Sequence, residues 1–219
     1  MRINNIKPQL AVLTPAKSRI IARLKGDGSI FVGGRRRTNY LIKYESNDKH
    51  ELDIFSRDIM EVYGLSTKEE IHRSGKKPNK FLKQVFVRSK LAFLDLQKYG
   101  PFSSREWTVP NSIKSSNLSI RTEFLRTFFE DEGSVINSYG HKELRLYSIN
   151  LRGLKELINM LESFGIESKL RGGFGEGRNV YALVISDVKS IMKFKNEIGF
   201  SSARKRLKME KLTSKSSFS

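Results

Sequence analysis

The 219-residue chain contains no cysteine, which excludes a disulfide framework, a thiolate-bound zinc ion and thiol catalysis. Histidine is nearly as scarce. His50, His72 and His141 are scattered singly, so no pair of them has the spacing of a metal site. The apolar stretch near the N-terminus, Leu10 to Leu13, is far shorter than the ~18 residues that a transmembrane helix needs. These absences predict a soluble intracellular protein, in a prokaryotic cytoplasm or an organelle matrix, with no membrane association.

Acidic residues are also few relative to basic ones. Asp and Glu number 23 against 41 Lys and Arg, which gives a formal net charge of +18. The basic residues are spread along the whole chain, and 38% of the residues are hydrophobic, so the composition predicts a folded domain and excludes a disordered basic tail. Such a charge excess predicts a polyanionic partner.

Turn residues and hydrophobic periodicity predict the same succession of elements twice. Each half contains a helix, a strand hairpin, a second helix, a second hairpin and a third helix, from Thr14 to Gly100 and from Leu118 to Gly199. The simplest explanation is a tandem duplication, which gives an α+β fold of two pseudo-symmetric αββαββα repeats. We expect the first repeat at residues 1–102, a polar linker at 103–118, the second repeat at 119–212 and a disordered tail at 213–219.

Each repeat opens with an apolar helix that ends in an acidic residue and a glycine. Asp27 precedes Gly28 in the first repeat, and Glu132 precedes Gly133 in the second. A carboxylate at the C-terminal end of a helix faces the negative end of the dipole and needs compensation. If the two helices pack side by side, the two acids meet, and a divalent cation relieves their repulsion. Oxygen ligands alone suit Mg²⁺ or a similar ion such as Mn²⁺.

Both segments resemble the LAGLIDADG motif, and roughly residues 14–212 resemble a single-chain LAGLIDADG homing endonuclease with two motifs. The resemblance implies that the motif helices form the interface between the repeats and that two antiparallel sheets form a saddle on DNA. It also implies that Asp27 and Glu132 bind divalent metal and position the attacking water. Gly26 and Asp131 would offer their backbone carbonyls to the metal.

The sequence departs from the motif at three positions. Lys25 replaces the first acid of the first motif, a position that is not one of the two that bind metal, so we expect activity to be retained. Thr127 and Asp131 stand where small residues are usual. We therefore expect looser helix packing on the side of the second motif.

The activity implied by the resemblance is a double-strand break in a long, imperfectly palindromic DNA target, made by a monomer. Hydrolysis of a phosphodiester needs an acidified water and a stabilised leaving oxygen, which paired metal ions supply. Basic side chains near the scissile phosphate add charge stabilisation, and their positions make Arg88 and Lys43 the predicted catalytic partners.

Residues on strands and hairpin loops are expected to contact the bases, with other lysines on the phosphates. The predicted DNA-binding residues are Arg35, Arg36, Arg37, Asn39, Lys43, Lys76, Lys77, Lys80, His141, Lys142, Arg145, Arg171, Arg178 and Asn179. A basic last helix, which contains Arg204, Lys205, Arg206, Lys208 and Lys211, is expected to face phosphates.

Two other functions fit the same fold. One is an intron maturase that binds structured RNA and assists splicing, and the other is a DNA-binding regulator that does not cut. The presence of both motif acids favours the endonuclease over these alternatives.

Overall fold

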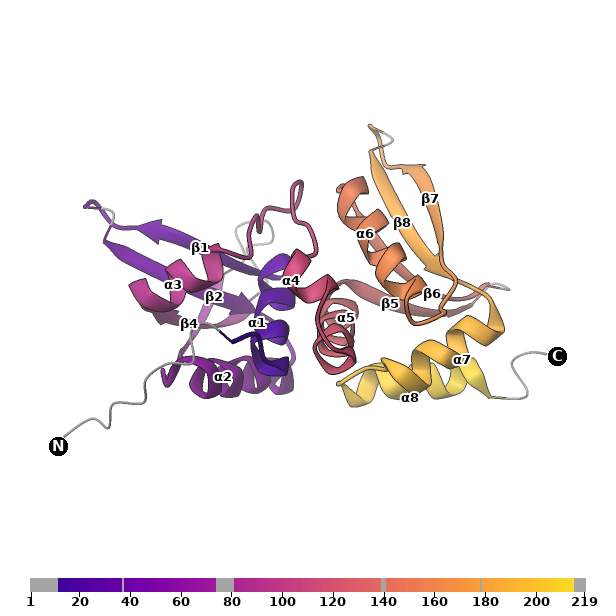
Figure 1. The fold of residues 1–219 in the computed structure, drawn as a ribbon, viewed down its shortest axis with the longest axis horizontal. Helices are drawn as coiled ribbons and strands as arrows, with labels where there is room; N and C mark the ends of the chain where they lie inside the picture. The colour runs from indigo at the N-terminus through magenta and orange to yellow at the C-terminus, as the bar shows by residue number, and fades with distance from the viewer. Residues whose placement is uncertain (1–11, 37, 74–80, 139–140, 178, 215–219) are drawn as a thin grey trace.

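A computed structural model describes residues 12–36, 38–73, 81–138, 141–177 and 179–214 (Figure 1). The first repeat consists of α1 (Pro15–Lys25), β1 (Gly28–Gly33), β2 (Asn39–Glu45), α2 (Lys49–Tyr63), β3 (Lys68–Arg73), β4 (Phe81–Arg88) and α3 (Lys90–Gln97). The second consists of α5 (Leu118–Glu132), β5 (Gly133–Ser138), β6 (His141–Ser148), α6 (Leu151–Glu162), β7 (Lys169–Phe174), β8 (Val180–Ile185) and α7 (Val188–Glu197). Two helices lie outside this pattern, α4 (Asn111–Lys114) and α8 (Ala203–Thr213). The predicted α+β duplication is confirmed.

The two sheets have the same topology. Their strand orders are β1-β2-β4-β3 and β5-β6-β8-β7, and all neighbouring strands are antiparallel. Gly28 lies opposite Tyr44 in the first sheet, as Gly133 lies opposite Leu146 in the second. Helices α2 and α3 pack on one face of the first sheet, and α6 packs on the second. The first strand of each sheet begins just after a motif helix ends, since β1 follows α1 and β5 follows α5.

The two motif helices lie side by side in the centre of the molecule and join the repeats (Figure 1). Thr14 caps α1 by accepting a hydrogen bond from Lys17 N at 3.2 Å, and Pro15, which has no N–H to leave unpaired, starts the first turn. Asn117 caps α5 in the same way through Ile120 N. A Cβ at Gly26 would lie 3.1 Å from the Cβ of Asp131, so the close approach of the two helix ends needs glycine there.

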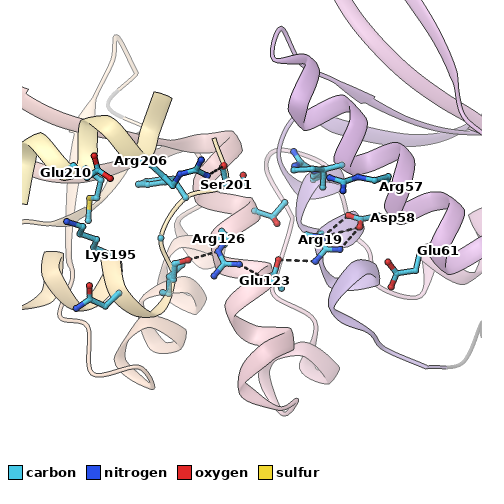
Figure 2. Close-up of a pocket in the computed structure, with 18 residues that line it drawn as sticks. Arg19, Arg57, Asp58, Glu61, Glu123, Arg126, Lys195, Ser201, Arg206 and Glu210 are labelled. Atoms are coloured by element: carbon cyan, nitrogen blue, oxygen red, sulfur yellow. Dashed lines mark hydrogen bonds and ion pairs between the residues drawn. The ribbon is translucent and has the colours of Figure 1, made fainter. Parts of the chain in front are cut away.

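A ladder of ion pairs crosses the interface on the side away from the sheets (Figure 2). Arg19 on α1 pairs with Asp58 on α2 and, through Nη1 at 3.1 Å, with Glu123 on α5. Arg126 pairs with the other oxygen of Glu123 and donates to Ile198 O at 2.6 Å. The ladder forms the floor of a cavity of about 700 Å³ between α2 and α8 and links the two repeats.

The segment between the repeats packs on the second repeat. Trp107, Val109 and Ile113 are buried, and the Trp107 ring lies 4.8 Å from the ring of Phe128. Asn150 donates to Trp107 O at 2.6 Å. A polar linker is predicted over this stretch, and the structure adds that three of its apolar side chains pack against the second repeat. The domain boundaries remain predictions. Among the helices of the described ranges, none is long and apolar enough to cross a membrane.

Candidate active site

The ends of the two motif helices bring Asp27 and Glu132 to the same place in the molecule. The Cβ position at Gly26, next to Asp27, is 3.4 Å from Oε1 of Glu132. Asp27 opens into a cavity of about 350 Å³ that Lys205 also lines. Glu132 opens into a second cavity of about 280 Å³ on the side of β6, together with Tyr147. The two acids thus lie together and face two different cavities.

The surroundings raise the pKa of both carboxyl groups. Burial and then the charge of Asp27 raise the pKa of Glu132 to about 7, against the opposing effect of Lys205. Burial and the charge of Glu45 raise the pKa of Asp27, again opposed by Lys205. Neither carboxylate makes a hydrogen bond or ion pair with another residue within the described part of the chain. An added cation would therefore relieve unfavourable electrostatics at this point.

The two acids fit a hard divalent cation. No cluster of three or more His, Cys, Asp or Glu side chains suited to a metal occurs among the described residues. Mg²⁺ does not need such a cluster, because it keeps several waters and binds one or two carboxylates together with substrate phosphates. Two carboxylates at adjacent helix ends match that requirement. The binding of this cation by the backbone carbonyls of Gly26 and Asp131 remains a prediction.

The side chain of Asp131 bonds to residues of the first repeat, unlike the side chain of Glu132, which faces a cavity. Its Oδ1 accepts hydrogen bonds from Arg23 Nη1 at 3.0 Å and from Tyr44 OH at 2.7 Å, both in the first repeat. Arg23 also pairs with Glu51, and burial raises the pKa of Asp131 to about 7. A residue larger than the motif's usual one is thus accommodated by a buried polar network across the interface.

Lys205 holds the end of α5. We predicted that it faces phosphates with its neighbours on the last helix, and this is wrong, because its side chain is buried. Its ammonium donates to Phe129 O at 3.1 Å, to Gly133 O at 2.7 Å and to Glu130 O. These carbonyls form the negative end of the helix dipole, so the cation satisfies them and stabilises the turn that carries Glu132.

The replacement of an acid by Lys25 is matched by a change in its contacts. In the second repeat, Glu130 accepts hydrogen bonds from Ser201 N at 2.9 Å and from Ser202 Oγ at 2.6 Å. At the corresponding place in the first repeat, Lys25 donates to Tyr99 O at 2.8 Å and to Pro101 O at 3.0 Å. In the second repeat the motif residue accepts hydrogen bonds from the segment after α7, and in the first repeat the motif residue donates them to the corresponding segment after α3. The motif end is therefore tied to this segment in both repeats.

Comparison with known proteins agrees with this geometry. Residues 119–199 match the family model of the LAGLIDADG-like domain. The chain is 24% identical over 190 residues to homing endonuclease I-ApeI of Aeropyrum pernix, an alignment that covers 85% of this chain and 82% of the relative. Its fold is similar to that of I-DmoI in complex with DNA and Mn, with a TM-score of 0.64, 17% identity and coverage of 87% of this chain and 99% of the other. It is also similar to I-WcaI bound to its DNA recognition sequence, with a TM-score of 0.68, 17% identity and coverage of 91% and 88%.

A LAGLIDADG-like domain therefore occupies residues 119–199, and the whole chain has a fold similar to that of the homing endonucleases I-DmoI and I-WcaI. The structure brings some of the predicted side chains to the motif ends and leaves others away from them. Lys43 lies on β2 with its Nζ 2.6 Å from Glu45 Oε1, and Glu45 is the residue whose charge acts on Asp27. Lys43 is thus paired with a neighbour of the acid pair, and its catalytic role remains a prediction.

Arg88 is not brought to the motif ends. It lies opposite Leu41, three residues along β2 from Tyr44, which faces the motif glycine Gly28. It is exposed and stacks on the ring of Phe86, 4.9 Å from the ring centre. The strand register thus places Arg88 away from the acids, which does not favour the predicted catalytic role.

The predicted DNA-binding residues fall into three groups. The exposed ones are Arg35, Arg36, Asn39, His141, Arg171 and Asn179. The partly buried ones are Lys43, Lys142 and Arg145. The ones that lie outside the described residues are Arg37, Lys76, Lys77, Lys80 and Arg178. Those that the structure describes are accessible in whole or in part, and their contacts with DNA remain predictions.

The raised pKa of Glu132 predicts how stability depends on pH. Between its ordinary pKa of 4.5 and about 7 the folded chain holds a proton that the unfolded chain has lost, so the free energy of unfolding falls as pH rises through this range. Divalent cations bind the ionised form, so the stabilisation by Mg²⁺ grows over the same range. Thermal unfolding with Mg²⁺ and with EDTA, from about pH 5 to about pH 8, measures both effects. An Mg²⁺ effect independent of pH would contradict the assignment.

Loss of the Lys205 ammonium is expected to destabilise the protein. In the Lys205→Met variant the carbonyls at the end of α5 lose a buried donor, which costs about 1–3 kcal/mol in the free energy of unfolding. Urea unfolding measures this. Lys208→Met, an exposed position on the same helix, is the control and should change stability by less than about 0.5 kcal/mol. Equal effects of the two variants would show that the cap contributes nothing.

Proposed function

We propose that this chain is a metal-dependent, site-specific DNA endonuclease that makes a double-strand break in a long, pseudo-palindromic target. The observation that carries the proposal is the placement of two acids, Asp27 and Glu132, at adjacent ends of the two motif helices, where neither makes a hydrogen bond or ion pair with another described residue. The similarity of fold supports it, since the I-DmoI and I-WcaI structures to which the chain is similar were solved with DNA.

Asp27 and Glu132 would hold Mg²⁺ or Mn²⁺ between the two cavities. A bound divalent ion lowers the pKa of the attacking water and neutralises charge on the phosphate. Lys205 fixes the turn of Glu132, and Lys43, which pairs with Glu45 on the same strand, would contribute positive charge toward a scissile phosphate. The two acids come from opposite repeats and line different cavities. In this proposal, one DNA strand is cleaved beside each cavity.

The faces of the sheets that the helices leave open are the proposed DNA surface. The formal net charge of +18 favours the phosphate backbone, and side chains on alternate positions of the strands face the grooves. The two repeats have different residues at equivalent strand positions, so one chain acting as a monomer can recognise two unlike half-sites.

The test is cleavage of a randomised duplex library by the purified protein, with Mg²⁺, Mn²⁺, Ca²⁺ or EDTA. We expect Mg²⁺ and Mn²⁺ to give discrete products from one enriched sequence class, and EDTA to give none. Absence of cutting under every condition would contradict the proposal. Tight binding to a structured intron RNA in that case would favour the maturase, and tight binding to one duplex sequence would favour a regulator that does not cut.

A further inference from the structure

Glu143 is a buried carboxylate on the open face of the second sheet. Along β6, Leu144 and Leu146 face the helix side and belong to the hydrophobic core. Glu143, Arg145 and Tyr147 alternate with them and therefore face the other side. Glu143 is 2% exposed, although a carboxylate on a solvent-facing sheet surface is ordinarily hydrated.

Two arginines cover this carboxylate. Arg145 on the same strand pairs with its Oε1, and Arg171 on β7 lies 3.3 Å from its Oε2 through Nη1. The strand β8 lies between β6 and β7, so the contact bridges three strands. Val184 is opposite Arg145 and Ala182 is opposite Arg171, and both are completely buried without belonging to the core on the helix side. Arg171 thus reaches across β8 to Glu143, and Arg145 lies along β6 between Glu143 and Tyr147.

A second contact fixes the orientation of Arg145. Its Nη1 donates to Tyr147 OH at 2.7 Å, and the Tyr147 ring meets the ring of Phe174 edge-on, with centres 6.0 Å apart. Arg145 is 20% exposed and Arg171 is 44% exposed, so both keep N–H groups that a ligand can reach. Among the described residues of the first sheet there is no such cluster at the equivalent place, because Leu41 stands where the second sheet has Glu143.

We propose that Glu143 is a positioning residue that holds Arg145 and Arg171 ready to recognise guanine in one half of the DNA target. An arginine held in a fixed plane donates two parallel hydrogen bonds to O6 and N7 of guanine in the major groove. Side chains ordered before binding lose less entropy on binding. This inference rests on the proposed DNA-binding function. It predicts that the half-site beneath the second sheet selects guanine at the positions the two arginines reach, and that the half-site beneath the first sheet does not.

The experiment is enrichment of bound sequences from a randomised duplex library in Ca²⁺, for the full chain and three variants. Glu143→Gln keeps the shape but loses the charge, and Glu143→Asp keeps the charge but is too short to bridge both arginines. We expect each to reduce the preference for guanine at these positions about tenfold. We also expect Glu143→Gln to bind unselected DNA as tightly as the unaltered chain or more tightly, with a salt dependence steeper by about one ion. A purely structural task would instead weaken selected and unselected binding together.

Glu70→Gln is the matched control. It also removes one carboxylate from the open face, but in the first sheet, where Glu70 accepts a hydrogen bond from Gln84 at 2.9 Å and pairs with no arginine in the part of the chain that the structure describes. Guanine preference should be unchanged in this variant. Unchanged base preference in both Glu143 variants would overturn the inference. Selection of a half-site without guanine by the unaltered chain would also overturn it. Both results would leave the proposed function standing. If the unaltered chain enriches no sequence, the inference and the proposed function both fail. Thermal unfolding of each variant shows whether it is folded. If Glu143→Gln does not fold, the base preference of Glu143→Asp tests the inference.

Discussion

Replacement of Asp27 by Asn or of Glu132 by Gln is expected to reduce DNA cleavage on the order of 10³-fold or more. Each substitution keeps the size of the side chain and removes one of the two charges that would hold the metal. DNA binding should persist or tighten, because a negative charge close to the phosphates is lost. Single-turnover cleavage of the selected duplex in Mg²⁺, with a binding titration in Ca²⁺, separates the two effects.

Asp53→Asn serves as the control for these variants. Asp53 is an exposed residue of α2 whose ion pair with Lys49 lies away from the motif ends, so cleavage should be unchanged. Retention of ordinary cleavage by either motif variant would show that the chemistry resides elsewhere. Loss of binding together with cleavage would show that the acid maintains the fold of the surface instead.

The Arg23→Met variant is expected to lose about 3–5 kcal/mol in the free energy of unfolding. Arg23 is completely enclosed, pairs with Glu51 and Asp131, and lies over the ring of Tyr44 at 4.6 Å. Without it, two buried carboxylates from opposite repeats are left without a cation. Urea or guanidinium unfolding at neutral pH measures the loss.

A second substitution tests whether the unpaired carboxylates cause the loss of stability in Arg23→Met. Addition of Asp131→Asn to the Arg23→Met variant should recover part of the stability, since only Glu51 then remains as an unpaired charge. The exposed Arg57→Met on α2 is the reference for loss of an arginine without burial. A loss below about 1 kcal/mol in Arg23→Met would mean that the network contributes little to the joining of the two repeats.

Local features of the sequence predicted the repeated elements and the motif acids. The cap at Thr14, the glycines at the helix ends and the alternation in the strands all act within a few residues of each other, so one segment at a time suffices to recognise them. Asp27 and Glu132 were found for the same reason, because each immediately precedes the glycine at which a helix ends.

Contacts between distant segments could not be predicted in this way. The ammonium of Lys205 bonds to Gly133 O, 72 residues earlier in the chain, and no pattern in the last helix distinguishes it from its exposed neighbours. The same holds for the contact of Arg23 with Asp131, 108 residues away. The place of Arg88 depends on the direction of β4 in the sheet order, which strand propensity alone does not give.

The most direct test of a cleavage site at the motif helix ends is to map where both DNA strands are cut relative to the region that the protein protects. Because Asp27 and Glu132 lie where the two repeats meet, we predict one cut on each strand, close to the centre of the protected region, both dependent on Mg²⁺ or Mn²⁺. End-labelling each strand of the selected duplex and comparing cleavage with a hydroxyl-radical footprint gives the answer. Cuts at the edge of the footprint, or on one strand only, would contradict a cleavage site formed by the two motif helix ends.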